Sequence, residues 1–202
     1  MKEITTILTT HAVFSEDGKK RYLLTKTCDT EKPRLTIIML APSEASGIEL
    51  DNTTMLVLNN ASRIGYGEVN IVNLFATLGS YRLGRSTEPD EENLAMIDQA
   101  AKHSDAIVYA PGVGKASNKV FVERQNQVLN ILRPYEKKLH CLSNNVGMAR
   151  FQHPLSPALR MWYLSPMKVS ELYQGEQSEE TDVPKNDKKA SAKRSNQKIS
   201  PP

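Results

Sequence analysis

The chain has 202 residues, of which 39% are hydrophobic and 24% are charged, and its formal net charge is +3. These values fit one ordinary globular domain, and the small basic excess is far from that of a dedicated nucleic-acid coat protein. The two cysteines, Cys28 and Cys141, form no CxxC pair, which argues against a disulfide framework and against a zinc or iron–sulfur site.

The two ends of the sequence carry no targeting or spanning pattern. The first ten residues, MKEITTILTT, lack the apolar core of a signal peptide, and no later stretch approaches the roughly 20 apolar residues that cross a bilayer. We therefore expect a cytoplasmic protein with no membrane partner. From Gln174 onward only Val183 and Ile199 are large aliphatics, which predicts a disordered tail over residues 174–202 and a single domain over residues 1–173. The basic portion of the tail, Lys185 to Lys198, suits a solubilising tail or one that attracts phosphate backbones.

The first half of the domain alternates strand and helix patterns. His11 to Phe14 and Arg21 to Thr25 are β-prone and flank the polar link SEDGKK, which predicts a hairpin. Leu35 to Leu40 is apolar on both faces, as a central strand should be, and it stops at Ala41-Pro42. A helix capped by Asp51 or Asn52 follows and runs through Ser62.

The second half continues the alternation. The buried strand VNIVNLF is followed by a helix that begins in the cluster Glu88 to Glu92 and runs to about His103. Strand Ala106 to Ala110, a helix after PGVGKASNK, and strand Lys138 to Leu142 complete the pattern. This order predicts an α/β fold: a three-layer sandwich with a mostly parallel central sheet, preceded by the N-terminal hairpin.

Ligands bind beyond the carboxyl ends of the strands in such sheets. Four segments should therefore converge on one crevice: MLAPSE (Met39 to Glu44), NLFATLG, APGVGK, and the late SNN and QHPLSP (Gln152 to Pro157) stretch. Pro42 forces the chain out of the sheet, so that Ser43 and Glu44 either enter the crevice or end the strand in solvent. The amide of Asn73, inside an apolar strand, either bonds loop backbone or contacts a ligand.

Several enzyme classes are not supported. APGVGK lacks the GxxxxGK[ST] spacing of nucleotide triphosphatases. No metal-spaced histidines, Ser/His/Asp order or GxSxG elbow occurs, which argues against serine and metal hydrolases. His153 is a structural histidine or part of a site, since Ser156, Arg160, Trp162 and Tyr163 lie close to it in the sequence.

The runs HAVFSEDGKKRY, IIMLAPSEA, LDNTT, IGYGEVNIVNLFA and QHPL resemble an uncharacterised bacterial and phage domain family. Its members read approximately VFS..G.YRY, MLNPSTAD, DDPT, GYG...VVNLFA and RHPLYL, and the likeness covers most of residues 11 to 165. The order of these motifs is more distantly similar to the uracil-DNA glycosylase superfamily, with a GxDPY-type strand end, a base-reading Asn and a late HPSPLS-type loop.

This resemblance implies a fold like that of uracil-DNA glycosylase and a role for each segment. MLAPSE would position water, Asn73 would contact a flipped base, and QHPLSP would press on the DNA backbone and insert a leucine into the stack. His153 would donate to the leaving base. The implied base-binding residues are Ala41, Pro42, Ser43, Asn73, Phe75 and Tyr66, and the implied DNA-binding residues are Leu155, Ser156, Leu159, Arg160 and Lys115, with Ser43 also at a phosphate.

One position departs from the pattern. Ala41 stands where the activating glycosylases have Asp or Asn, and it cannot orient water. Catalysis would pass to Glu44, or otherwise to Asp51, or the protein would bind without cutting. The small side chains from Ala41 to Gly47 would leave room for a bulky base of the kind found in some phage DNA.

We therefore expect a monomeric, monofunctional DNA glycosylase without cofactor or metal. It would excise a modified or non-canonical base from double-stranded DNA, with phage DNA among the candidate substrates, in antiviral defence. A nucleoside- or nucleotide-processing enzyme with the same crevice and a non-catalytic DNA- or protein-binding module are the alternatives. Steep weakening by salt would distinguish DNA binding from action on free nucleotides.

Overall fold

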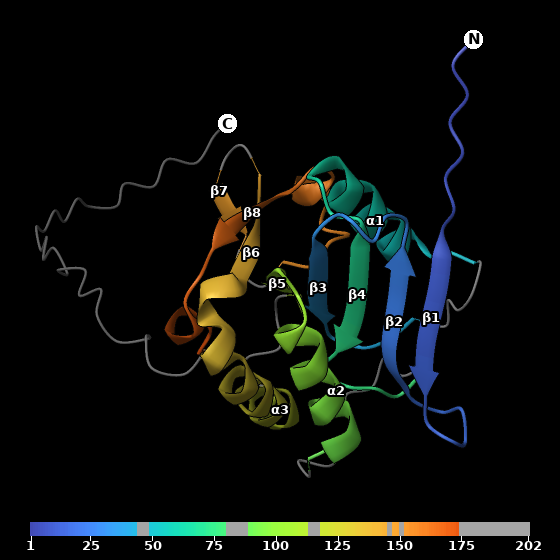
Figure 1. The fold of residues 1–202 in the computed structure, drawn as a ribbon. Coiled ribbons are helices and arrows are strands. Elements are labelled where there is room, and N and C mark those ends of the chain that lie inside the picture. Colours follow the sequence, from blue (N-terminus) through green and yellow to red (C-terminus); the bar gives the residue numbers. More distant parts are fainter. Residues whose placement is uncertain (44–48, 80–88, 113–117, 145–146, 150–151, 174–202) are drawn as a thin grey trace, which may run out of the picture.

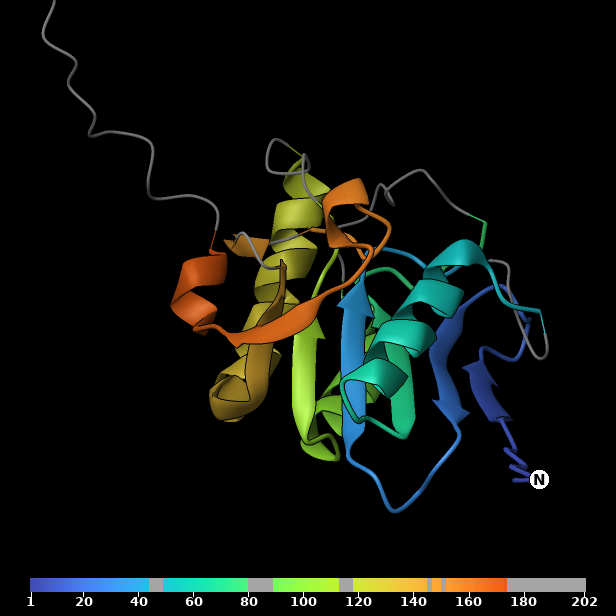
Figure 2. The ribbon, with the colours of Figure 1, turned by 90° about the horizontal axis from the view of Figure 1, so that it is seen from above.

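In the computed structural model a single sheet carries helices on both of its faces (Figures 1 and 2). The structure describes residues 1–43, 49–79, 89–112, 118–144, 147–149 and 152–173. The strands are β1 (Thr9–Phe14), β2 (Arg21–Thr27), β3 (Arg34–Met39), β4 (Glu68–Asn73), β5 (Ala106–Tyr109), β6 (Leu139–Asn144), β7 (Gly147–Ala149) and β8 (Tyr163–Pro166). The helices are α1 (Asn52–Arg63), α2 (Glu91–Lys102) and α3 (Lys119–Leu132), with short 3-10 turns η1 (Arg133–Lys138), η2 (Pro157–Leu159) and η3 (Val169–Leu172).

The strands follow the order β1-β2-β4-β3-β5-β6-β7, and β8 also pairs with β6. The central strands β4, β3, β5 and β6 run parallel, and the predicted hairpin of β1 and β2 is present. β2, β7 and β8 join the parallel strands in antiparallel fashion. The α/β class is thus confirmed, but the sheet is mixed rather than mostly parallel. β7 and β8 escaped prediction because they are only three and four residues long and show no apolar alternation.

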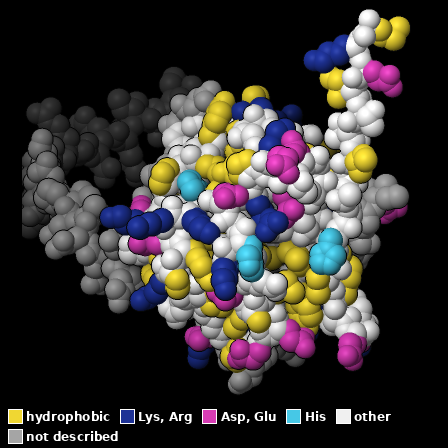
Figure 3. Space-filling model, viewed as in Figure 1, with side chains coloured by type: hydrophobic (Ala, Val, Ile, Leu, Met, Phe, Trp, Pro, Cys, Tyr) yellow, Lys and Arg dark blue, Asp and Glu magenta, His cyan; other side chains and the backbone are white. Residues whose placement is uncertain are grey.

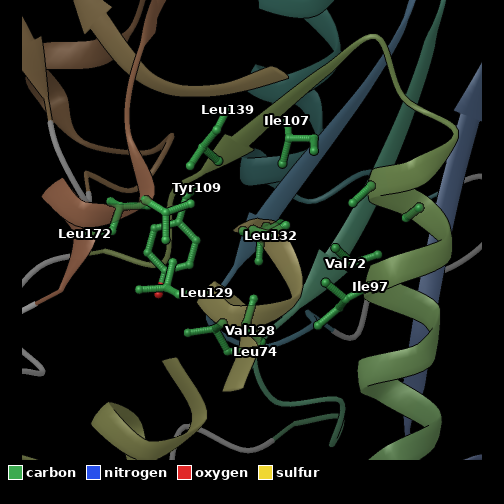
Figure 4. Packing of buried hydrophobic residues seen from close by; sticks show 14 of the residues in the cluster. Val72, Leu74, Ile97, Ile107, Tyr109, Val128, Leu129, Leu132, Leu139 and Leu172 are labelled. Carbon is green, nitrogen blue, oxygen red and sulfur yellow. The ribbon is translucent and has the colours of Figure 1, made fainter. Parts of the chain in front are cut away.

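Each face of the sheet has its own apolar core. Alternate residues of the strands point to opposite faces, so Ile38 and Val72 pack toward α2 and α3, whereas Ile37 and Ile71 pack toward α1. Figure 4 shows part of the first core, with Val72 from the sheet, Ile97 from α2 and Leu129 from α3. The helices therefore form the outer layers of the predicted three-layer sandwich.

The crossover from β3 through α1 to β4 determines where the first turn of α1 lies. Because β3 and β4 are parallel neighbours, α1 must run back along the sheet, and it begins at the carboxyl ends of the strands. Figure 2 shows α1 crossing one face of the sheet, with η2 beyond the arrowhead of β3. The helix starts at Asn52 because Asp51 caps it, as predicted, and Gly65, with a φ of 97°, ends it.

Candidate functional site

Ser43 and Asp51 join the end of β3 to the start of α1. The Ser43 hydroxyl donates to Asp51 Oδ2 across 2.5 Å. The same carboxylate accepts the Thr54 backbone N–H at 2.8 Å and the Thr54 hydroxyl at 3.0 Å. Asp51 is therefore the N-cap of α1 and, at the same time, the anchor of the loop that follows Pro42.

Asp51 is held in its ionised form. Burial favours the neutral acid, but the hydrogen bonds from Ser43, Thr54 and the Thr53 backbone outweigh burial and lower the pKa of Asp51. These donors occupy the acceptor positions that a carboxylate offers. Asp51 thus supplies a fixed negative charge to the site and has little capacity left to take a proton from water.

His153 brings the late segment to the same place. Burial lowers the pKa of His153, and the negative charge of Asp51 partly opposes this effect, which places the two side chains within electrostatic range of each other. The ring is therefore neutral at pH 7. Its Nδ1 accepts the Leu155 backbone N–H at 3.2 Å, so the ring proton resides on Nε2, which can donate to a ligand.

Gly112, which follows β5, lies next to the same histidine. A Cβ atom on Gly112 would lie 3.7 Å from the His153 Cβ, and Gly112 has a φ of 94°, a conformation that glycine adopts without strain. The carboxyl end of β5 is therefore next to His153, as the predicted convergence of the loops requires.

Asn73 is the last residue of β4 and is only 1% exposed. Its register partner is Met39, which belongs to the core beneath α1, so the Asn73 side chain is on the α1 face of the sheet. The buried Asn73 Nδ2 has no hydrogen-bond partner among the described residues. A buried donor without a partner costs about 1–3 kcal/mol, which a ligand with an acceptor group would recover.

Two polar residues of this region were not foreseen. Asn93, in the first turn of α2, donates from Nδ2 to the Asn73 and Leu74 carbonyls at 2.9 and 3.3 Å and so fixes the end of β4. Arg21 is 2% exposed, and its Nη1 donates to the Ser43 carbonyl at 3.2 Å. In the sequence, Arg21 was marked only as a cation inside a β-prone run. The face of the sheet on which its side chain lies could not be predicted, because it depends on a local irregularity of the hairpin.

A family model described as "Protein of unknown function (DUF1643)" matches residues 21–155. The chain belongs to this family. The DUF1643 region begins at Arg21 and ends at Leu155, so it contains Ser43, Asp51, Asn73 and His153. A comparison with curated proteins found no match.

In this DUF1643 protein the structure links Ser43, Asp51 and His153 to one another and places Asn73 at the same carboxyl edge of the sheet. Pro42 is buried and Ala41 is half-buried just before them. Leu155 is 43% exposed beside His153, Ser156 is half-buried and Arg160 is exposed. Glu44 and Lys115 lie outside the described residues.

Three predicted site residues lie elsewhere. Leu159 is 0% exposed in the core beneath α1, so it cannot insert into a DNA stack; Leu155 is the exposed leucine of this segment. Tyr66 follows the last turn of α1 and precedes β4, at the opposite edge of the sheet, where the charge of Asp105 acts with burial to raise its pKa. Phe75 packs on the core beneath α2 and α3, with the Arg124 guanidinium 5.6 Å from the centre of its ring.

Within the described ranges, no group of three or more His, Cys, Asp or Glu side chains is arranged to hold a metal ion. In the same ranges, the helices are too short or too polar to cross a lipid bilayer.

Proposed function

We propose that this protein is a DNA glycosylase that flips a modified or non-canonical base out of the duplex and hydrolyses its N-glycosidic bond. The observation that carries this proposal is the buried Nδ2 donor of Asn73, which has no hydrogen-bond partner in the part of the chain that the structure describes. An amide of this kind suits a ligand with a carbonyl acceptor, and a nucleobase edge presents such acceptors. The distant similarity of the motif order to the uracil-DNA glycosylase superfamily supports the same choice.

The reaction breaks the bond between the sugar C1′ and the base nitrogen, and the electron pair of that bond leaves with the base. Asn73 Nδ2 would donate to a base carbonyl, and the neutral His153 would donate from Nε2 as negative charge grows on the base. The negative charge of Asp51 would stabilise the positive sugar through space, which needs no open acceptor. Water then bonds to C1′ and gives up a proton.

The acceptor for that proton is the second carboxylate of the loop, Glu44. Ala41 has no polar group, and the acceptor positions of Asp51 are already occupied. Glu44 is two residues beyond Pro42 and outside the described part of the chain. The base that leaves as an anion takes up a proton from solvent, which completes the hydrolysis.

The segment around His153 supplies the contacts to DNA in this proposal. Leu155, exposed beside His153, would fill the space that the flipped base vacates, and Ser156 and Arg160 would hold the backbone phosphates. Ser43 has a smaller role than its sequence position suggests. Its single hydroxyl proton is donated to Asp51, so its side chain has no proton left for a phosphate.

The target in this proposal is a bulky base, such as a hypermodified base of phage DNA, and the biological role is antiviral defence. The support is the small size of Ala41 and Ser43 at the end of β3.

The test uses three duplex substrates: plain DNA, DNA with uracil, and hypermodified phage DNA. After incubation with purified protein, alkaline treatment breaks the strand wherever a base has been removed. We expect breaks in the hypermodified DNA, fewer with Leu155→Ala, and none with Asn73→Leu. Unbroken DNA in all three samples would overturn the glycosylase proposal.

One observation favours a second function, which is binding without cutting. Ala41 cannot orient water, and Asp51 is occupied by its own hydrogen bonds. The chain would belong to the class of non-catalytic DNA-binding modules if it bound hypermodified DNA tightly, in a salt-sensitive manner and without breaking it. The variant Glu44→Gln should then bind as tightly as the wild type. Release of free base from nucleosides or nucleotides alone would assign it instead to a nucleoside-processing enzyme.

A further inference from the structure

A bulge in the hairpin of β1 and β2 determines on which face of the sheet the Arg21 side chain lies. In the register of β1 and β2, Val13 lies opposite Leu23 and Phe14 lies opposite Arg21, so Tyr22 is the extra residue. Leu23 packs on the core beneath α2 and α3, and the Tyr22 hydroxyl donates to Glu92 in α2. Both side chains therefore share one face, and Arg21 comes next on the opposite face, toward α1.

On that face Arg21 contacts the start of the loop after β3. Its Nη1 donates to the Ser43 carbonyl at 3.2 Å, and the Ser43 hydroxyl donates to Asp51 at 2.5 Å. Ser43 is thus held at its backbone by β2 and at its side chain by the cap of α1. The Arg21 backbone N–H donates to the Ala76 carbonyl at 2.9 Å, which ties the same end of β2 to the segment after β4.

We propose that Arg21 is a positioning residue of the candidate site, which acts by holding Ser43 and, through Ser43, the carboxylate of Asp51 in place beside the substrate. The proposal rests on the proposed function for its kinetic part, and its structural part stands on the contacts alone. No motif of the predicted site assigned a role to Arg21.

The guanidinium of Arg21 is buried within electrostatic range of Asp51. Arg21 is 2% exposed, and the attraction of Asp51 opposes the effect of burial, which lowers the pKa of Arg21. The attraction is mutual, so Arg21 also stabilises the ionised form of Asp51. Arg21, from β2, and the neutral ring of His153, from the segment before η2, are both within electrostatic range of Asp51.

Lys26 provides a matched control in the same strand. It is also 2% exposed, burial also lowers its pKa, and its ammonium donates to the Thr10 hydroxyl at 2.7 Å. Lys26 lies near the other end of β2, opposite Val69 at the start of β4. A general effect of removing a buried cation should therefore appear in Lys26→Met as well as in Arg21→Met.

The experiment compares Arg21→Met, Arg21→Lys and Lys26→Met in the full chain. On the DNA that the wild type cuts, we expect Arg21→Met to lower kcat about 100-fold with little change in KM, because misplaced groups lose activity without losing binding. Arg21→Lys keeps a donor and a positive charge, and it should recover at least part of that loss. Lys26→Met should keep the wild-type kcat.

A second measurement does not depend on activity. Carbon-detected NMR of the Asp51 carboxyl should give a higher pKa in Arg21→Met than in the wild type, and values close to the wild type in Arg21→Lys and Lys26→Met. An unchanged Asp51 titration in Arg21→Met would overturn the proposal, as would an equal loss of kcat in Lys26→Met. If the wild type cuts no DNA, the glycosylase proposal fails, while the Asp51 titration still decides whether Arg21 holds this carboxylate.

Discussion

The two edges of the parallel strands differ in how their polar groups are satisfied. At the amino edge a surface cleft is lined by Thr30, Lys32, Arg34, Glu68, His103 and Asp105. Arg34 pairs with Glu68 through Nε, donates its backbone N–H to Asp105 at 2.7 Å, and donates from Nη1 to the His103 carbonyl at 3.3 Å. At the carboxyl edge Asn73 is buried with an unpartnered donor.

This difference separates the two edges by how their polar groups are satisfied and not by how many charges they carry. Figure 3 shows Lys, Arg and His side chains over the middle of one face, interspersed with Asp and Glu. The described charges of the amino-edge cleft are largely paired with one another. Because they lie near solvent, where the dielectric constant is high, such pairs contribute little to stability. A buried donor without a partner has a real cost, and a fold retains it where a ligand offsets that cost.

The largest expected effect comes from Asn73→Leu. Removal of the donor should lower base excision more than about 100-fold, since a site built to hydrogen-bond its substrate loses that discrimination. The free energy of unfolding should not fall below the wild-type value, because the lost Nδ2 donor has no partner among the described residues and its burial is itself a cost of about 1–3 kcal/mol. Denaturant unfolding and excision assays measure the two quantities.

Asn70→Leu is the control for Asn73→Leu. Asn70 is in the same strand but on the other face, where its amide contacts the Thr25 and Thr36 hydroxyls at 2.7 and 3.4 Å. Loss of these contacts should cost about 1–3 kcal/mol of stability. Equal stability losses in the two variants would contradict the distinction between a satisfied and an unsatisfied amide.

The next effect in size concerns the cap at Asp51. Asp51→Ala should cost about 0.5–2 kcal/mol because α1 loses its N-cap, whereas Asp51→Asn should keep most of the cap and lose the charge. Since the pKa of Asp51 lies below its ordinary value of 3.8, its contribution to stability is present above that pH and is lost as the pH falls through the lower folded value. The free energy of unfolding, measured in urea at pH 7 and pH 3, should fall more between the two pH values in the wild type than in Asp51→Asn.

His153 should give a smaller effect, confined to weakly acidic pH. Its folded pKa lies below the ordinary value of 6.5, so the unfolded chain takes up the proton first. Its contribution to stability is therefore present above pH 6.5 and declines as the pH falls through the folded pKa. Between pH 7.5 and 5.5, the free energy of unfolding should depend less on pH in His153→Gln than in the wild type. It should depend more on pH in Asp51→Asn, because the negative charge that raises the pKa of His153 is then absent.

The smallest effect is expected at the amino edge. Arg34→Met removes a partly exposed ion pair, and such pairs contribute about 0–1 kcal/mol. Base excision should keep its wild-type rate. A loss of excision comparable to that of Asn73→Leu would place function at the amino edge and break the comparison.

Sequence patterns predicted the parts of the site that regular elements position. The alternation of strands and helices placed the loops after β3, β4 and β5 at one edge, and the capping preference of Asp51 placed its carboxylate at the start of α1. The roles of Leu155 and Leu159 were not separable, because a short irregular segment has no periodicity to indicate which leucine is buried.

Two other positions show where prediction from sequence ends. Tyr66 is close in sequence to Asn73, but it precedes the strand that Asn73 ends, so the length of β4 separates them. The direction of Arg21 depends on one extra residue in a hairpin, and a shift of one residue exchanges the two faces of a strand.

The strand order β1-β2-β4-β3-β5-β6 also has a consequence for folding. The candidate site combines Arg21 from near one end of the domain with His153 from near the other, so no fragment shorter than residues 21–153 contains it. Pairings between residues so distant in sequence form slowly, since the chain must first close long loops. A nascent or partly folded chain would therefore carry the helices and the central strands without an assembled site, and the candidate site would be complete only when β2 and the segment before η2 have both docked.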